Sequence, residues 1–287
     1  MNMITKYLLS LALTLAYVYS PAQETNIQDQ SDQCEFYPIM EDMKTWIKDR
    51  KRAKKKKLIT VAGLGVYKDQ LYMIDNNIRI PDIYTFDFES KKWKPAQDST
   101  LFYTLQSIYA EKYLPWGLKG IEIVNDTLFA LRLENKCISA IQLGSNERVY
   151  DPIFRLPDYH GSDGAMAIAY SYPMVYLAYH ALDYKIDIEK TQRLFGVNVE
   201  TGDILFDSQL YISHIRRDGV HALTSLGMDV WHGRENEIVR MDNATGEILS
   251  VHQFNPIGRP SSMCFYKNSL WISTYYGGLH EIPFSCN

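Results

Sequence analysis

The amino-acid sequence predicts an all-β fold, a β-propeller of five to six four-stranded blades with a short N-terminal helix. Three observations lead to this fold class. A motif that pairs a Gly with an aromatic-rich strand recurs at intervals of about one blade length. A second motif, built around a Thr-Gly turn, recurs later in the same units. No long helical pattern separates the units, which argues against a parallel α/β fold.

The first motif places a Gly eleven residues before the apolar residue that opens an aromatic-rich strand. Each copy predicts an inner strand, a tight turn and a second strand. Shorter versions occur near both ends of the chain, starting around Gly63 and Ser262. The three full copies align without gaps and run from Gly117 to Leu128, from Gly164 to Val175 and from Gly219 to Val230.

The second motif alternates apolar and polar residues around Thr-Gly. Residues 197–205 align without gaps to residues 241–249, and residues 86–91 form a weaker copy. This pattern predicts the hairpin between the third and fourth strands of a blade. Five units are clear from Leu58 to Phe284. A sixth could be built from residues 95–115 or by the N-terminal segment, so the sequence leaves the blade number open.

The N-terminus resembles a secretory signal. A charged start is followed by an apolar run from Tyr7 to Tyr19 and by small residues at Ser20 to Ala22. The run is short for a membrane span, so we expect a secreted, extracellular protein without a membrane anchor. The expected divisions are a signal peptide (1–22), an N-terminal segment with a helix and a basic run (23–57) and a β-propeller domain (58–287).

A basic run overlaps the end of the predicted helix and continues toward the propeller. Residues 40–52 have helical spacing of apolar side chains, and residues 48–57 carry eight bases and one acid. Because the net charge of the chain is −4, the remainder carries −11. The run is typical of a solvated helix end or a linker. Lys54–Lys57 could alternatively bind an anionic surface, whereas the acidic body argues against nucleic acid as a partner.

Four cysteines enter the oxidising compartment that the signal predicts, and they allow three pairings. Cys34 lies just before the repeats and Cys286 just after them, so a disulfide between them would close the ring. Cys264 occupies an apolar position of an innermost strand, which is typical of a buried free thiol. The pairing of Cys137 and Cys264 stays open.

Blade geometry predicts which end of the propeller binds a ligand. The glycosylation sequons at Asn125 and Asn243 fall in first-to-second and third-to-fourth turns, which share one face of the disc. Both glycans would therefore lie on that face and leave the opposite mouth bare. The opposite mouth receives the longest loop, residues 179–193, and we expect it to be the binding face.

Five segments carry a resemblance to known propellers, namely Arg217–Val220, Val230–Trp231, Ile238–Arg240, Thr245–Leu249 and Pro260–Cys264. They resemble the gluconolactonase/regucalcin group of six-bladed propellers, whose architecture strictosidine-synthase-like and insect yellow proteins share. The resemblance is at the level of the superfamily and is best from Gly161 to Leu270.

The resemblance implies a divalent cation such as Ca²⁺ at the channel mouth, held by an oxygen-rich ligand set. Asp218 matches the Asp of that set, and Asp163 stands where the group has an Asn. The other two positions differ, because Gly63 replaces a Glu and Trp116 replaces an Asn. A cation site would therefore rest on Asp163 and Asp218 alone, and no catalytic residue is assigned.

The residues that replace the metal ligands favour an organic ligand. Aromatic walls with a few acids suit a planar or cationic molecule through stacking and cation–π contact, although each aromatic side chain could instead pack between blades. The predicted ligand-binding residues are Trp116, Asp163, Asp218, His221, His180 and Tyr276.

Three functions follow from these patterns. The first is a secreted, non-enzymatic carrier of a planar aromatic or amine ligand, with no cofactor required. The second is a metal-dependent lactonase or esterase-type hydrolase, and the third is a protein-interaction propeller. The sequence contains no Gly-x-Ser-x-Gly elbow, no phosphate-binding Gly-rich loop and no His-Glu-x-x-His pair.

Overall fold

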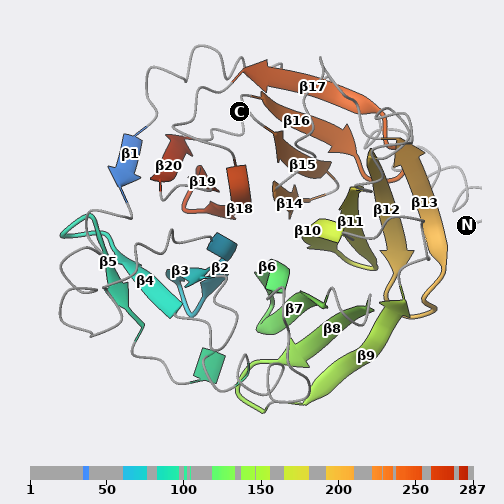
Figure 1. Ribbon diagram of the computed structural model, residues 1–287, viewed down its shortest axis with the longest axis horizontal. Coiled ribbons are helices and arrows are strands. Elements are labelled where there is room, and N and C mark those ends of the chain that lie inside the picture. The colour runs from blue at the N-terminus through green and yellow to red at the C-terminus, as the bar shows by residue number, and fades with distance from the viewer. Residues whose placement is uncertain are drawn as a thin grey trace, which may run out of the picture.

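The computed structural model arranges the chain as five antiparallel sheets of four strands around a centre (Figure 1). The structure describes residues 35–38, 61–75, 83–96, 100, 101, 104, 118–132, 137–145, 147–155, 165–180, 192–209, 222–227, 229–234, 237–253, 260–274 and 278–283.

In four of the sheets the strands follow one another in chain order from the centre of the ring outward, as the hairpin repeats predict. In chain order they are β1 (Glu35–Pro38), β2 (Val61–Tyr67), β3 (Gln70–Asp75), β4 (Ile83–Asp87), β5 (Lys92–Pro95), β6 (Leu118–Val124), β7 (Thr127–Arg132), β8 (Cys137–Gln142), β9 (Arg148–Arg155), β10 (Ala165–Ser171), β11 (Met174–His180), β12 (Gln192–Asn198), β13 (Ile204–Gln209), β14 (Ala222–Leu226), β15 (Asp229–Arg234), β16 (Glu237–Asp242), β17 (Ile248–Gln253), β18 (Pro260–Tyr266), β19 (Ser269–Thr274) and β20 (Gly278–Pro283).

Four of the blades take their strands from one continuous stretch of chain. Blade 1 is β2 to β5, blade 2 is β6 to β9, blade 3 is β10 to β13 and blade 4 is β14 to β17. Blade 5 is β18, β19 and β20, with β1 as its outermost strand. The innermost strands β2, β6, β10, β14 and β18 surround the centre of the ring (Figure 1).

The hydrophobic core is divided into five clusters, and each contains buried side chains of two neighbouring blades. The cluster between blades 5 and 1 includes Leu64 and Trp271. The backbone N–H of Leu64 also donates a hydrogen bond to Oγ of Ser262, at 2.7 Å. Blade 1 therefore packs directly on blade 5 as well as on blade 2, and the ring closes with five blades. The six-bladed alternative is wrong for this reason.

The N-terminal segment completes the last blade. Strand β1 pairs antiparallel with β20, with Glu35 opposite Glu281 and Pro38 opposite Gly278. Residues from the two ends of the chain thus share one sheet. The predicted signal peptide, the helix over residues 40–52, the basic run, Cys34 and Cys286 lie outside the described residues. In the ranges that the structure does describe, no helix is long and apolar enough to cross a membrane.

Three of the turns between first and second strands are two-residue turns with consecutive left-handed residues. Asn125 and Asp126 have φ of 48° and 58°, and the pairs Lys68–Asp69 and Lys267–Asn268 have similar values. Two positive φ angles in succession match the twist of a tight hairpin, and Asn and Asp tolerate them well. The tight turns that the first motif predicts between first and second strands are confirmed in these three blades.

In blades 1, 3 and 4 the turn between the third and fourth strands is fixed by the side chain at its first residue. Oδ1 of Asp87 accepts hydrogen bonds from the backbone N–H groups of Glu89 and Ser90. Asn198 and Asp242 do the same for the residues two and three positions later. These repeated turns explain the second motif, whose prediction as the third-to-fourth hairpin is confirmed.

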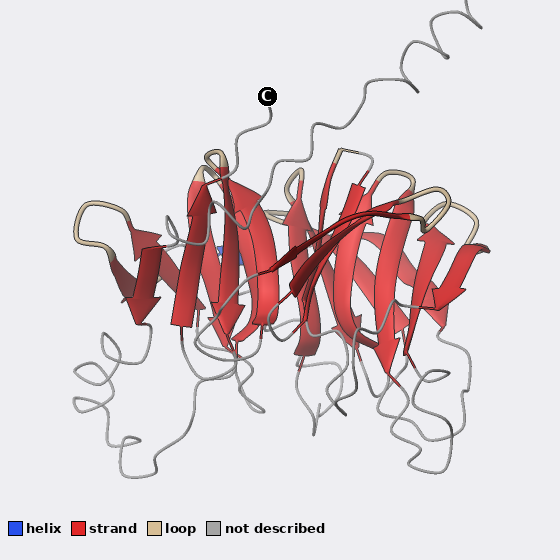
Figure 2. Ribbon diagram, turned by 90° about the horizontal axis from the view of Figure 1, so that it is seen from above, coloured by secondary structure: helices blue, strands red, loops and turns tan. Residues whose placement is uncertain are grey.

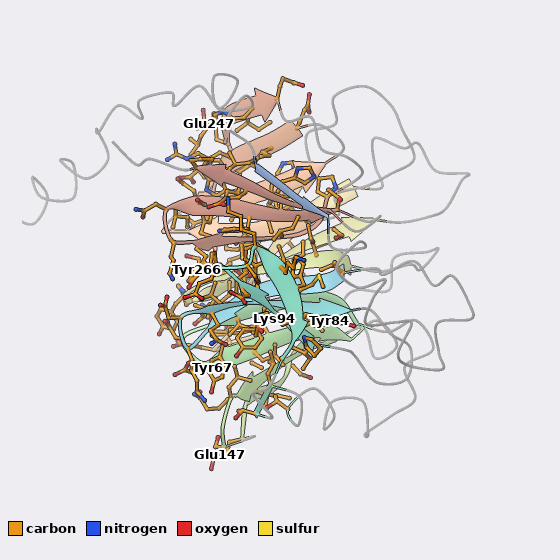
Figure 3. The ribbon with its side chains drawn as sticks, turned by 90° about the vertical axis from the view of Figure 1, so that its left-hand side faces the viewer. Tyr67, Tyr84, Lys94, Glu147, Glu247 and Tyr266 are labelled. Atoms are coloured by element: carbon orange, nitrogen blue, oxygen red, sulfur yellow. The ribbon has the colours of Figure 1, made fainter. Side chains whose placement is uncertain are left out.

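The two ends of the disc differ in their connections. The described turns, which join first to second and third to fourth strands, lie together at one end (Figure 2). Glu147 and Glu247, in two such turns, lie at that end together with Tyr67 and Tyr266 (Figure 3). Connections of up to 22 residues, such as 96–117 before β6, join strands at the other end. We call these ends the tight-turn end and the long-connection end.

Candidate functional site

Five of the six predicted ligand-binding residues, namely Trp116, Asp163, Asp218, His221 and Tyr276, lie outside the described residues. The sixth, His180, is the last residue of β11 and pairs with Gln192, but its side chain is not described. The described strands still show which inner strands three of these residues precede. Trp116 and Asp163 stand two residues before their inner strands and Asp218 stands four, so all three precede strands that start at the long-connection end.

The described part of the channel contains one layer that sequence reasoning missed. The inner strands carry equivalent residues that pair with a large aromatic side chain of the second strand in every blade. We call this set the channel layer. Its members and their partners are Gly65 with Tyr72, Glu122 with Phe129, Ala169 with Tyr176, Thr224 with Trp231 and Cys264 with Trp271.

Glu122 is the carboxyl group of this layer, and groups of blades 3 and 4 act on its pKa. It belongs to blade 2, yet the groups that favour its ionised form are the backbone N–H of Tyr170, the hydroxyl of Thr224 and the backbone N–H of Ser225. Thr224 and Ser225 belong to blade 4. Because blade 3 separates blades 2 and 4, the carboxyl can meet Thr224 only near the axis of the ring. Glu122 therefore occupies the channel itself.

The environment of Glu122 is costly for a charge. Its side chain is 8% exposed, and burial raises the pKa of its carboxyl well above the usual 4.5, outweighing the three hydrogen-bonding groups. Within the described part of the chain, its Oε2 atom has no hydrogen-bond partner. A buried polar atom without a partner costs about 1–3 kcal/mol. None of the groups acting on this pKa in the described residues is cationic, so no counter-charge offsets the burial.

Cys264 faces the same layer from blade 5. The structure confirms it as a buried free thiol. Burial, and then the charge of Glu122, raise the pKa of this thiol above its usual value of 9.0. A thiol of this kind is a poor nucleophile because the reactive thiolate is disfavoured. Cys264 thus contributes a weakly polar wall rather than a reactive centre.

The next layer toward the long-connection end consists of small residues. An ideal Cβ on Gly63 would lie 2.6 Å from Cβ of Ile121, in the neighbouring inner strand. At Gly120 the same construction meets Ile168 at 3.1 Å. Any longer side chain at Gly63 would collide with blade 2. The position at which the resemblance implies a Glu ligand therefore has no room for one. The small-residue layer is Gly63, Gly120, Ala167, Ala222 and Ser262.

A group of buried hydroxyls in blade 5 serves the fold rather than a site. Oγ of Ser261 lies 2.9 Å from Oγ of Ser273, and the Ser273 hydroxyl also donates to the carbonyl of Ser262 at 3.3 Å. Thr274 Oγ1 accepts a hydrogen bond from the N–H of Gly278. Strand β18 is irregular between Pro260 and Ser262, and the hydroxyls satisfy backbone groups beside that irregularity.

The structure describes the predicted glycosylation residues but not the predicted metal ligands. Asn125 is exposed in the β6–β7 turn, whereas Asn243 is 8% exposed, and both lie at the tight-turn end. Whether either carries a glycan stays a prediction. Among the described residues no group of three or more His, Cys, Asp or Glu side chains could hold a metal ion. Asp163 and Asp218, the predicted ligands, lie outside those residues.

Comparison with known proteins identifies no family. No family model matches the chain, and no curated protein matches it. Solved structures that are similar are BamB from Moraxella catarrhalis (12% identity, 77% of this chain and 59% of BamB covered, TM-score 0.41), glutaminyl cyclase from Myxococcus xanthus (10%, 78% and 90%, 0.49) and the computationally designed Ika4 protein (15%, 59% and 92%, 0.38). The aligned region thus spans about three fifths of BamB.

Proposed function

We propose that the protein is a secreted, non-enzymatic carrier that binds a planar aromatic or amine-bearing molecule at the long-connection end of the propeller channel. The observation that carries the proposal is the division of the connections between the two ends. The described tight turns lie at one end, and the longest connections join strands at the other. Trp116, Asp163 and Asp218 stand two to four residues before three inner strands that begin there, which supports the proposal that these residues share one mouth.

Binding without a metal is favoured over hydrolysis by the geometry at Gly63. We place the chain beside the gluconolactonase/regucalcin superfamily by its motifs, although its ring has five blades. In that group a Glu is implied where this chain has Gly63, and here Ile121 fills the adjoining space. A cation held by Asp163 and Asp218 alone would lack most of the oxygen ligands that Ca²⁺ takes.

The first experiment asks what accompanies the protein. The full chain is purified from its natural source, its absorption spectrum is recorded, and its organic extract and metal content are measured. We expect a co-purifying aromatic compound and no stoichiometric calcium. One tightly held calcium per chain, lost together with hydrolytic activity in Asp218→Ala, would contradict the proposal.

The second experiment measures binding with defined probes. Calorimetry compares tryptamine, a planar amine, with indole-3-acetate, its anionic counterpart. We expect tryptamine to bind more tightly, and Asp218→Asn to weaken it about tenfold, which corresponds to about 1.4 kcal/mol. Asp203→Asn is the matched control, because Asp203 is an exposed acid in the turn before β13, at the tight-turn end. Equal affinities for the two probes would count against an amine ligand.

A further inference from the structure

The channel layer contains an unusual combination of burial and unmet hydrogen bonding. Glu122 is 8% exposed, its Oε2 has no partner, and no cation in the described residues acts on it. A buried carboxylate needs a partner that is both positive and able to donate hydrogen bonds. The other layer positions are small and uncharged, namely Gly65, Ala169, Thr224 and Cys264, so none of them supplies that positive charge.

We propose that the channel layer is a binding site for a single ammonium group, held by Glu122 with Thr224 beside it. An ammonium group supplies one positive charge and several N–H donors. Oε2 of Glu122 is a free acceptor for one of them. The Thr224 hydroxyl has two lone pairs and can accept another. The ammonium group is either a free ammonium ion or the head of a primary amine.

The same residues are a poor site for a divalent metal. Ca²⁺ takes six to eight oxygen ligands and Mg²⁺ requires near-octahedral geometry, whereas the layer offers one carboxyl, one hydroxyl and one thiol. The thiol of Cys264 has a pKa raised by burial, which opposes the thiolate that a soft metal needs. Ammonium makes no such demand, because hydrogen bonds replace coordination.

Binding at this site exchanges the proton of the Glu122 carboxyl for an ammonium group. Burial raises the pKa of Glu122, so the empty layer favours the protonated carboxyl. When ammonium binds, the carboxyl proton leaves to solvent, and the carboxylate and ammonium charges balance each other. Cys264 is the other titratable group of the layer, and it stays protonated because burial and Glu122 both raise its pKa. Affinity for ammonium should therefore rise about tenfold per pH unit below the pKa of Glu122.

The experiment uses the full chain and four chloride salts at constant ionic strength. Ammonium and methylammonium carry N–H donors, tetramethylammonium carries the same charge without donors, and potassium is an inorganic control. Urea unfolding and calorimetry in two buffers of different protonation enthalpy are recorded at several pH values. We expect the first two salts to stabilise the protein with release of about one proton per site, and the other two to have no specific effect.

Variants locate the effect. Glu122→Gln should abolish the ammonium response, and Thr224→Val should weaken it while leaving the carboxyl in place. Glu247→Gln is the matched control, because Glu247 is an acid in a turn at the tight-turn end (Figure 3). Asp218→Asn should also keep the response, which separates this site from the proposed carrier site at the mouth.

Comparison of the salts also identifies the source of the ammonium group. Tighter binding of ammonium indicates the free ion, and tighter binding of methylammonium indicates an amine head group. Equal responses to all four salts, or the same ammonium response in Glu122→Gln as in the wild type, would overturn the proposal. Should Glu122→Gln fail to fold, an unchanged response in Thr224→Val together with no proton release would overturn it.

Discussion

Replacing Gly63 by Ala tests how closely the inner strands of blades 1 and 2 approach each other. The new Cβ would lie 2.6 Å from Cβ of Ile121 and 3.0 Å from its carbonyl oxygen. Carbon atoms in favourable contact are about 3.5–4.0 Å apart, so the strands must separate by about 1 Å. Overpacking of this kind costs about 1–3 kcal/mol. We expect the upper half of that range, because the obstacle includes backbone that no rotamer change can move.

The assay is thermal unfolding followed by circular dichroism, with urea unfolding for the free energy. In a domain of this size, each kcal/mol lowers the midpoint temperature by about 2–4 °C, so Gly63→Ala should lower it by roughly 4–12 °C. Gly65→Ala is the matched control. Its Cβ would meet Cδ1 and Cγ1 of Ile123 at 3.0 Å, and the end of that side chain can rotate away. We expect that variant to lose less than about 1 kcal/mol.

Second-site changes sharpen the test. Ile123→Val removes Cδ1, one of the two atoms at 3.0 Å, and should restore part of the stability that Gly65→Ala loses. Ile121→Ala should not restore Gly63→Ala, because alanine retains the Cβ that causes the collision. Wild-type stability in Gly63→Ala, or its rescue by Ile121→Ala, would refute the inference that backbone approach sets this position.

Four further predictions concern titration, reactivity and modification. The pKa of Glu122 is higher in the folded than in the unfolded protein. Its contribution to stability is therefore complete below the unfolded pKa of about 4.5 and is lost as the pH rises through the folded pKa. In urea unfolding, the wild type should lose stability relative to Glu122→Gln as the pH rises. His280 has the opposite sign, because burial lowers its pKa to about 4, so its contribution is present above about 6.5 and is lost as pH falls toward 4; His280→Gln should flatten that acid limb. The thiol of Cys264 should react with a disulfide reagent only after unfolding, and modification at the rate of a free thiol in the native protein would contradict its burial. In a eukaryotic secretory host Asn125→Gln should remove one glycan mass while Asn243→Gln removes none, because Asn243 is buried; two lost glycans would show that the β16–β17 turn opens.

Local chemistry explains which parts of the fold the sequence predicts. The Asn125–Asp126 turn and the Thr-Gly hairpins rest on residues that favour left-handed backbone or bond to their own turn, so a short stretch of sequence suffices. Closure of the ring is different. Glu35 pairs with Glu281 from the far end of the chain, and the four residues of β1 contain no pattern that predicts pairing with β20.

The candidate site likewise has one part that the sequence indicates and another that only the fold reveals. The alignment of the three full copies of the first motif places Glu122 at the same position as Ala169 and Thr224. The sequence therefore already shows an acid at a position where the other copies have small residues. The sequence does not predict that Thr224 acts on Glu122, because the two residues approach each other only when blades 2 and 4 converge on the axis. The predicted mouth residues Trp116, Asp163 and Asp218 precede strands whose direction the structure fixes, but they lie outside the described residues.

Depth along the channel determines whether the two proposed sites act on one ligand. Glu122 lies four residues beyond the start of β6, which at about 3.3 Å per residue is roughly 13 Å from the long-connection end. A compact aromatic amine such as tryptamine, about 8–9 Å long, bound beside Asp218 cannot also reach Glu122. The effects of Asp218→Asn and Glu122→Gln on its binding should then be independent, so that the double variant shows their sum. An elongated ligand, with an aromatic end and a terminal amine separated by a flexible chain, would contact both residues and make the two effects non-additive. A double-mutant cycle with tryptamine and with a longer aromatic amine therefore tells two separate sites from one extended site.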